Sequence, residues 1–415
     1  MKDSTLRAID RWAGVPACAV LTLHRKLFRR RERPQPLRRI LFIKLAEQGA
    51  TVLASGALDR ACDLVSRDNV FFLSFRENRF ILDAMGIVPP ANVLTIDART
   101  PATTVRSLVS VIRRMRALEI DAAIGLEFFA RSSAILAYMS GACLRVGLHS
   151  YAGEGPYAGN LLTHPLVYNP YLHTHEMFLA TVEALRQPGG RFPAFDMRCP
   201  PVAETLRTYE PTKQDLDTVR RLVCEATASN ALPPLILLNA NCRDALPLRR
   251  WGGDRYVELA RRLLEALRGV HILFTGAPVE ADEAQRLAHD VDSARCASVA
   301  GRTTVPQLLA LFGLADVLVT NDSGPAHFAA LTPIDVVTLF GPETPALFGA
   351  RTPRNHVLWA GLVCSPCVSA FNNRVSKCRD NVCMQRITVD QVFETVTAVY
   401  RRRTAGQSAR IDQPS

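Results

Sequence analysis

The sequence lacks any apolar run of the roughly 18 residues that a membrane-spanning helix needs, so no segment is predicted to cross a bilayer. Residues 13–23, AGVPACAVLTL, form a shorter apolar stretch that follows Lys2, Arg7 and Arg11. This stretch contains Pro16, and a strongly basic segment comes after it. We therefore interpret it as an interfacial amphipathic segment rather than a cleaved signal peptide.

Acidic residues are scarce just beyond this stretch, in residues 25–39, RKLFRRRERPQPLRR, where Glu32 is the only one. A basic segment of this kind suits anionic lipid headgroups or nucleic acid. Few aromatics lie among its charges and no recognised nucleic-acid-binding module follows, so we expect no nucleic-acid partner. We expect residues 1–37 to contact an anionic membrane surface and the protein to be cytoplasmic, at the inner face of the membrane. A solvated basic arm is the alternative.

A chain of 415 residues can bury a large core, so it does not need disulfides for stability. Seven of its eleven cysteines are scattered, as buried thiols in a reducing compartment usually are. The other four lie together in CSPCVSAFNNRVSKCRDNVC: Cys364, Cys367, Cys378 and Cys383. This spacing leaves open a structural zinc site, packed reduced thiols, or disulfides, which the cytosol disfavours.

Short apolar runs alternate with helical stretches in both halves of the chain, a pattern typical of parallel sheets covered on both faces. The predicted strands are 39–45, 69–75, 92–97 and 121–129, then 234–240, 270–276, 317–321 and 336–341. The sequence thus predicts an α/β protein with two doubly wound, Rossmann-like domains facing a cleft. The predicted parts are an N-terminal acceptor domain (38–190), a Pro/Gly-rich linker (191–232), a C-terminal nucleotide-sugar domain (233–386), a terminal helix (387–403) and a disordered tail (404–415).

Polar residues follow the predicted strands of the second half, where parallel sheets bind their ligands. In VLVTNDSGPAHFAAL, the turn Asp322-Ser323-Gly324 precedes a helix with His327 in its first turn, a suitable site for a phosphate without a P-loop. The alternative is that these residues only cap the helix. Further candidates for donor binding follow other strands of this half: Asn241, Arg249, Arg250, Glu280, Gly341 and Thr344.

The segment TNDSGPAHFAALTPIDVVTLFGPETP resembles the signature of glycosyltransferase family 9, the heptosyltransferase-like enzymes of the GT-B fold. NCRDALPLRRWGGDRYVELARRL and ILFIKLAEQGATVLASGAL are similar to other family segments, so the resemblance covers nearly all of the chain after residue 38. It implies transfer of a sugar, often a heptose from ADP-heptose, to a lipopolysaccharide-type acceptor with inversion. It also implies a lipid-linked saccharide acceptor and no metal cofactor for catalysis, because cations and N–H groups offset the charge of the leaving diphosphate.

One departure from the family pattern concerns the catalytic base, which the family carries as an Asp after the first strand's Gly. Here Gly49 is followed by Ala50. We hypothesise that Glu47 replaces this Asp, with Glu127 as the second candidate. The alternative is a shifted loop with solvated glutamates, or a weakened enzyme.

Three further residues of the first half, Lys44, Gly49 and Arg145, are expected to bind the acceptor. The group His173-x-His175-Glu176 is interpreted as the start of a helix rather than a metal site. The alternative functions are a non-catalytic nucleotide-sugar-binding member of the family and a GT-B nucleotide-sugar epimerase.

Overall fold

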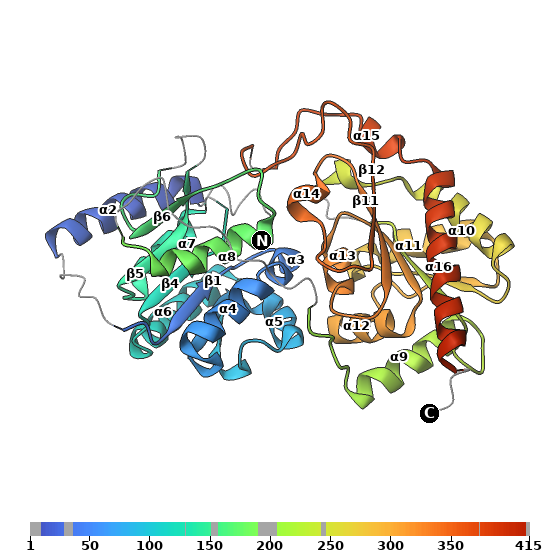
Figure 1. Cartoon of the computed structure of the whole chain (residues 1–415), viewed down its shortest axis with the longest axis horizontal. Helices are drawn as coiled ribbons and strands as arrows, with labels where there is room; N and C mark the ends of the chain where they lie inside the picture. The colour runs from blue at the N-terminus through green and yellow to red at the C-terminus, as the bar shows by residue number, and fades with distance from the viewer. Residues whose placement is uncertain are drawn as a thin grey trace. The chain divides into compact units, whose positions relative to one another are not determined.

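The computed structural model describes residues 10–28, 36–128, 130–150, 157–189, 206–241, 246–372 and 374–411. The chain forms two compact units, residues 1–203 and 204–415, each with its own parallel sheet (Figure 1). The division falls inside the segment 191–232 that the sequence predicted as a linker. The second part of that segment forms helix α9 (Lys213–Ala226), which packs against α12 (Val305–Leu314).

The first unit contains a six-stranded sheet of order β3-β2-β1-β4-β5-β6, with all strands parallel. Its central strands are short, apolar and buried on both faces, because helices cover both sides. The strands are β1 (Ile40–Ile43), β2 (Val70–Phe75), β3 (Val93–Ile96), β4 (Ala122–Gly125), β5 (Leu144–Ser150) and β6 (His164–Val167).

The second unit repeats this architecture with the order β12-β11-β10-β7-β8-β9, again all parallel. Counted along the chain within each unit, both sheets have the strand order 3-2-1-4-5-6 of the Rossmann fold. The strands are β7 (Leu235–Asn239), β8 (His271–Phe274), β9 (Cys296–Ser298), β10 (Val317–Asn321), β11 (Asp335–Phe340) and β12 (Asn355–Trp359).

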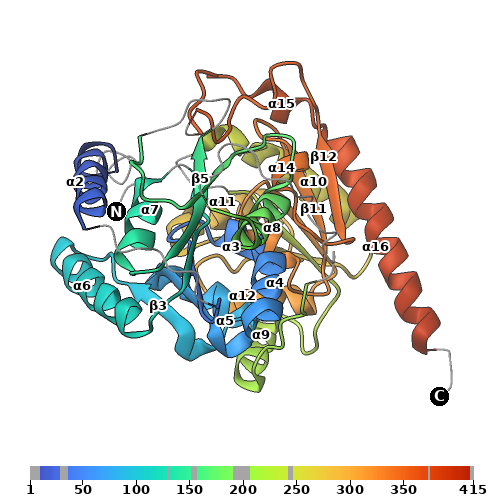
Figure 2. The same ribbon diagram turned by 60° about the vertical axis from the view of Figure 1, so that its left-hand side comes forward.

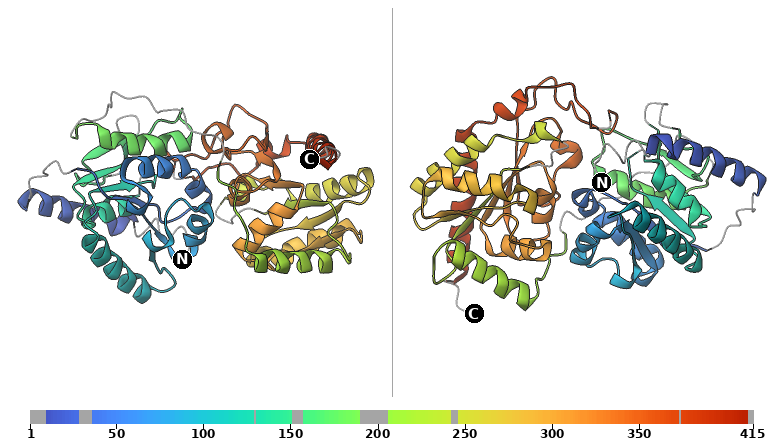
Figure 3. Two further views of the ribbon diagram at one scale, coloured as in Figure 1. Left: turned by 60° about the horizontal axis from the view of Figure 1, so that its bottom comes forward. Right: turned by 180° about the vertical axis from the view of Figure 1, so that it is seen from behind.

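Helices lie on both sides of each sheet, as the rotated views show (Figures 2 and 3). In the first unit, α6 and α7 contribute Val111, Met115 and Leu136 to a core beneath β1 and β2. The helices of this unit are α2 (Gly14–Leu27), α3 (Gln48–Val52), α4 (Ser55–Val65), α5 (Arg79–Met85), α6 (Pro101–Ala117), α7 (Arg131–Met139) and α8 (Thr174–Glu183).

In the second unit, α10, α11 and α16 pack on one face of the sheet, where Tyr256 and Leu259 meet Val392 and Val396. Helices α9 and α12 pack together, and α13 contacts α12, β10 and β11. The helices not yet given are α10 (Gly253–Ala266), α11 (Ala281–Val291), α13 (Gly324–Ala329), α14 (Pro345–Phe348), α15 (Val382–Gln385) and α16 (Val389–Ile411).

The eight predicted strands are confirmed, whereas β5, β6, β9 and β12 were not predicted. Three of these four, β6, β9 and β12, are edge strands. An edge strand is less buried and needs no continuous apolar run, so the pattern in the sequence is weak.

The end of the chain differs from the prediction, because α16 continues to Ile411 instead of ending at residue 403. A helix that is already anchored by packing can add further residues without the cost of starting a new helix. The predicted tail residues 412–415 lie outside the described part. Among the described residues, no helix is both long and apolar enough to cross a bilayer.

Candidate active site

The switch point of the first sheet, where strand order reverses between β1 and β4, brings together Lys44, Glu47 and Glu127. The Nζ atom of Lys44 lies 3.4 Å from Oε2 of Glu47 and 3.3 Å from Oε2 of Glu127. The Lys44 side chain is completely buried, so its ammonium depends on these two carboxylates for compensation. The sequence predicted all three residues for this region, and the structure confirms that they lie together.

The two carboxylates differ in how they are held. Glu127 Oε1 accepts hydrogen bonds from the backbone N–H groups of Leu45 and Ala46, at 2.7 and 3.0 Å, and so fixes the loop after β1. Glu47 is the more exposed of the two, with 27% of its side chain accessible against 12% for Glu127. Glu47 also has a left-handed backbone (φ 66°), which is costly for a residue other than glycine. Glu47 is therefore the carboxylate more available to a ligand.

Gly49 and Ala50 lie in the short helix α3 that follows this loop. Ala50 is buried and carries no group that can accept a proton. Glu47 precedes α3 as its N-cap residue, on the ligand-binding edge of the sheet.

Arg145 differs from its expected acceptor-binding role. It lies near the amino end of β5, whereas ligands bind beyond the carboxyl ends of parallel strands. Its buried guanidinium donates hydrogen bonds to the carbonyl oxygens of Ala142, Cys143 and Leu161 and so stabilises the loops at that edge.

The interpretation of His173 and His175 as helix-start residues is confirmed. His173 Nδ1 accepts a hydrogen bond from the His175 N–H, and Glu176 accepts one from the His173 N–H, at the first turn of α8.

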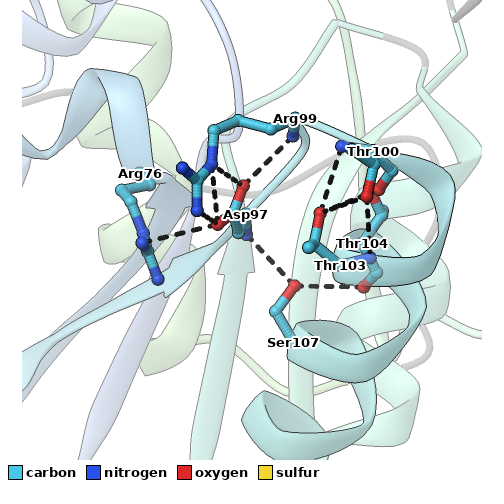
Figure 4. Close-up of polar contacts among 7 residues, drawn as sticks. All are labelled: Arg76, Asp97, Arg99, Thr100, Thr103, Thr104 and Ser107. Carbon is cyan, nitrogen blue, oxygen red and sulfur yellow. Dashed lines mark hydrogen bonds and ion pairs between the residues drawn. The ribbon is translucent and has the colours of Figure 1, made fainter.

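A cationic group that the sequence analysis missed lies at the carboxyl ends of β2 and β3 (Figure 4). Arg99 forms a bidentate interaction with Asp97, and Arg76 Nη1 lies 3.4 Å from the same carboxylate. The hydrogen bonds from Arg99 lower the pKa of Asp97 to about 2. Thr100 then caps α6. Both arginines occur just after predicted strands, which was the signal available in the sequence.

The switch point of the second sheet lies between β7 and β10, and Arg249 is its central cation. Arg249 Nη2 donates to Oε1 of Glu343 at 2.7 Å. Its Nη1 donates to the carbonyl oxygen of Asp322 at 3.1 Å and lies 3.3 Å from the Asp322 carboxylate. Glu343, which sequence analysis did not assign to the site, stands in the Gly-Pro-Glu-Thr turn after β11.

One buried guanidinium thus faces two buried carboxyl groups. Burial raises the pKa of Asp322, although Arg249 and Arg374 oppose the rise. Burial also raises the pKa of Glu343, from its ordinary 4.5 to about 7, and the neighbouring Asp322 adds to the rise. Both carboxyl groups therefore hold a proton more readily than an exposed acid does, which limits the negative charge beside Arg249.

Asn241 and Asn321 flank the same switch point, after β7 and at the end of β10. Asn321 is used structurally: its Oδ1 accepts from the Trp251 N–H, and its amide donates to the Ala240 carbonyl. Both polar atoms of the Asn241 side chain are buried and have no hydrogen-bond partner in the described part of the chain. A buried amide of this kind is costly unless it has a ligand to bind.

The predicted turn Asp322-Ser323-Gly324 lies where expected, before α13, which carries His327 in a buried position. The Ser323 hydroxyl lies 3.2 Å from that of Thr320. A Cβ on Gly324 would meet only the Phe328 ring, at 3.5 Å and beyond, so packing of the chain itself does not require glycine here. Close approach of a ligand to the backbone would explain it.

Four other predicted donor-site residues have local roles in this structure. Glu280 accepts the Ala277 N–H and caps its own helical turn, and the Thr344 hydroxyl accepts the Ala346 N–H at α14. Gly341 lies against α15, where a Cβ would collide with the Met384 side chain. The Arg250 carbonyl accepts a hydrogen bond from Asn381.

The four clustered cysteines are free thiols, with Cys364 and Cys378 exposed, Cys367 half-buried and Cys383 buried. Burial raises the pKa of Cys383, and its three neighbouring thiols add to the rise. Within the described ranges, no three Cys, His, Asp or Glu side chains are arranged to hold a metal ion.

Comparison with known proteins identifies the family. The sequence model of glycosyltransferase family 9 (heptosyltransferase) matches residues 108–376, well over half of the chain. The chain belongs to glycosyltransferase family 9. Lipopolysaccharide heptosyltransferase 2 of Salmonella typhimurium is 28% identical over 138 residues, which are 32% of this chain and 39% of that relative. The sequence match thus spans less than half of the relative's length.

The family 9 assignment agrees with the solved structures. ADP-heptose lipopolysaccharide heptosyltransferase II of Escherichia coli has a TM-score of 0.66 at 18% identity, over 88% of this chain and 99% of that one. E. coli heptosyltransferase WaaC, solved with ADP, has a TM-score of 0.62 at 16% identity, over 87% and 99%. These similarities show that the family 9 chain has the GT-B fold.

We predict that Glu343 makes the stability of this family 9 protein pH-dependent. Because its pKa is raised from 4.5 to about 7, the folded state holds a proton that the unfolded state releases between these pH values. The free energy of unfolding should therefore fall as the pH rises through this window. In urea unfolding at pH 5, 6, 7 and 8, the free energy of unfolding of Glu343→Gln should decrease less with rising pH than that of wild type. Glu225→Gln, at an exposed glutamate, is the control; equal slopes for Glu343→Gln and wild type would contradict the prediction.

The cysteine cluster yields a second prediction. If the four thiols are free, a thiol reagent should modify exposed Cys364 and Cys378 rapidly in the native protein and buried Cys383 slowly. Metal analysis of the same sample should find less than one zinc per chain. If instead all four thiols react slowly and a chelator makes them reactive, the thiols hold a metal ion.

Proposed function

We propose that the chain is an inverting glycosyltransferase that moves a heptose from ADP-heptose to a lipopolysaccharide-type acceptor. The observation that carries this proposal is the pair of polar switch points. The switch point of the second sheet has the Arg249 guanidinium, two buried carboxyl groups and the Asn241 amide, which has no hydrogen-bond partner among the described residues. The switch point of the first sheet has the more accessible carboxylate of Glu47 next to the buried ammonium of Lys44. Family membership and the relatives named above support the sugar and the acceptor class.

The second unit would bind the donor. Arg249 is suited to a diphosphate because its fork can bind two oxygens at once. The Asp322-Ser323-Gly324 turn supplies backbone N–H groups, and Asn241 has both a donor and an acceptor available. A diphosphate would take over contacts that Arg249 makes with Asp322 and Glu343 in this structure. The structure of a relative with ADP supports the choice of nucleotide.

The first unit would bind the acceptor and supply the base. Glu47 would accept the proton of an acceptor hydroxyl, and the oxygen would attack the anomeric carbon of the sugar from the face opposite the diphosphate. The bond from that carbon to the diphosphate oxygen would break, and ADP would leave with its electron pair. Arg249 and the backbone N–H groups would offset the new charge, so the proposal requires no metal cofactor.

Lys44 would hold Glu47 in place, while Glu127 would hold the loop after β1. Gly49, beside this loop, remains a proposed acceptor contact. The proposal places the enzyme in the cytoplasm with an acceptor that is anchored in a membrane.

A non-catalytic nucleotide-sugar-binding protein is the second candidate, and Ala50 favours it. Other members of the family carry an acidic residue at this position, whereas the buried methyl group of Ala50 cannot accept a proton. Binding of the nucleotide without transfer would distinguish this function from the first.

We predict that Glu47→Gln lowers kcat about 10²- to 10⁴-fold, the usual contribution of a general base, and lowers the melting temperature less than Glu127→Gln does. Glu127→Gln should lower both, because its carboxylate accepts two backbone hydrogen bonds. Release of ADP from ADP-heptose in the presence of acceptor measures the rate. Glu77→Gln, at an exposed glutamate after β2, is the matched control. Near-normal turnover of the Glu47 and Glu127 variants would remove this mechanism.

Arg249→Ala should weaken ADP binding about 10- to 100-fold, as expected for loss of a charge-assisted hydrogen bond. Since this change also leaves two buried carboxyls unpaired, Arg249→Lys serves as a second variant that keeps the charge but loses the fork. Calorimetry with ADP measures the affinity, and Arg302→Ala, at an exposed site, is the control. Unchanged affinity in both folded Arg249 variants would place the diphosphate elsewhere.

A further inference from the structure

Helix α2 and the turn before it present large apolar side chains to solvent. Trp12, Val20, Leu23 and Leu27 are 77%, 65%, 57% and 69% exposed. Together with exposed Pro16 they follow the spacing i, i+4, i+8, i+11 and i+15, which places them on one side of a helix. We call these five residues the outer α2 face. Helix α2 lies at the periphery of the first unit (Figure 1).

The opposite side of α2 is already packed, which fixes the direction of the outer face. Cys18 is fully buried with Ala134 of α7 and Leu161, and Leu21 packs against them. Apolar residues therefore occur on both sides of this helix, and among the described residues of the first unit only the inner side has an apolar partner. The outer α2 face is exposed because the opposite side of the helix packs against α7 and Leu161.

Polar contacts at both ends of the helix hold this orientation. Asp10 accepts hydrogen bonds from the Arg131 backbone and side chain, at 2.9 and 2.8 Å. The Thr22 hydroxyl accepts from the Asn160 N–H at 3.2 Å, and Arg25 donates to the Leu162 carbonyl at 3.3 Å. Rotation of α2 to bury its outer face would break these contacts.

The charge around the outer α2 face is almost entirely positive. Asp10, the acid on the described residues 10–28, is paired with Arg131. Arg11 and Lys26 are exposed beside the apolar residues. In the sequence, residues 25–39 then carry eight Lys or Arg and a single Glu. An apolar strip with a basic border is the composition of helices that lie in the interface of anionic membranes.

We propose that the outer α2 face docks the protein onto an anionic lipid bilayer. The apolar side chains enter the boundary between headgroups and acyl chains, and the basic residues remain among the anionic headgroups. The helix lies flat, since its 14 residues extend only about 21 Å, less than a bilayer core of about 30 Å. A second copy of the chain fits this face less well, because it would bring two strongly basic segments together.

This surface precedes residues 108–376, which match the family, and its function does not depend on sugar transfer. A failure of the transferase assay would therefore leave the membrane proposal intact, and the reverse also holds.

The test is flotation of the full chain with vesicles of phosphatidylcholine alone or with about one third phosphatidylglycerol. We expect binding to the anionic vesicles, little binding to neutral ones, and release at high salt. Leu23→Gln with Leu27→Gln should reduce partition at least about tenfold. Val105→Gln with Val109→Gln, at exposed valines of α6, is the matched control and should bind as wild type does.

Trp12 provides a second measurement. Its emission should shift to shorter wavelength with anionic vesicles. Trp12→Phe should abolish the shift, because Trp251 is buried and Trp359, which is 40% exposed, lies in β12 of the second unit and outside the outer α2 face. Equal binding of the Leu23/Leu27 variant and wild type would overturn the proposal. A second result would also overturn it: the wild type is a dimer, the Leu23/Leu27 variant is a monomer, and neither protein binds vesicles. That result would assign the outer α2 face to a second copy of the chain.

Discussion

In a parallel sheet, every strand ends at the same edge, and only at the point where the strand order reverses do the following loops diverge to leave room for a ligand. Both sheets of this chain reverse between their first and fourth strands. Lys44 and Glu127 therefore meet although 83 positions separate them, and Arg249 meets Asp322 across 73. The position of every proposed functional group depends on this constraint.

The two switch points share an electrostatic arrangement: one cation lies between two carboxyl groups. Lys44 lies between Glu47 and Glu127, and Arg249 lies between Asp322 and Glu343. In each case the cation alone cannot fully compensate both acids when they are buried. In the second unit burial raises the pKa of both acids, and Asp322 adds to the rise at Glu343. In the first unit the more exposed acid, Glu47, is the one that we propose as the base.

The N-terminal helix adds a function that the two sheets do not need. Its inner side is packed, with Cys18 fully buried, whereas its outer side is exposed and has no apolar partner in the described part of the first unit. A helix that is apolar on both sides is usually buried on both sides. A bilayer surface supplies the missing apolar contact, and it would hold the enzyme close to a lipid-linked acceptor.

The sequence by itself determined the alternation of strands and helices, because buried central strands must be apolar along their whole length. It also located Glu47, Glu127, Arg249 and Asp322, since polar residues directly after such strands must lie at the ligand-binding edge. It did not reveal the edge strands β6, β9 and β12, whose partial exposure leaves little pattern. Nor could it show that Glu343 accepts a hydrogen bond from Arg249, or that Arg145 donates its hydrogen bonds to carbonyl groups at the opposite edge of the first sheet. Those roles depend on which side chains meet across loops that are distant in sequence, and only the tertiary structure decides that.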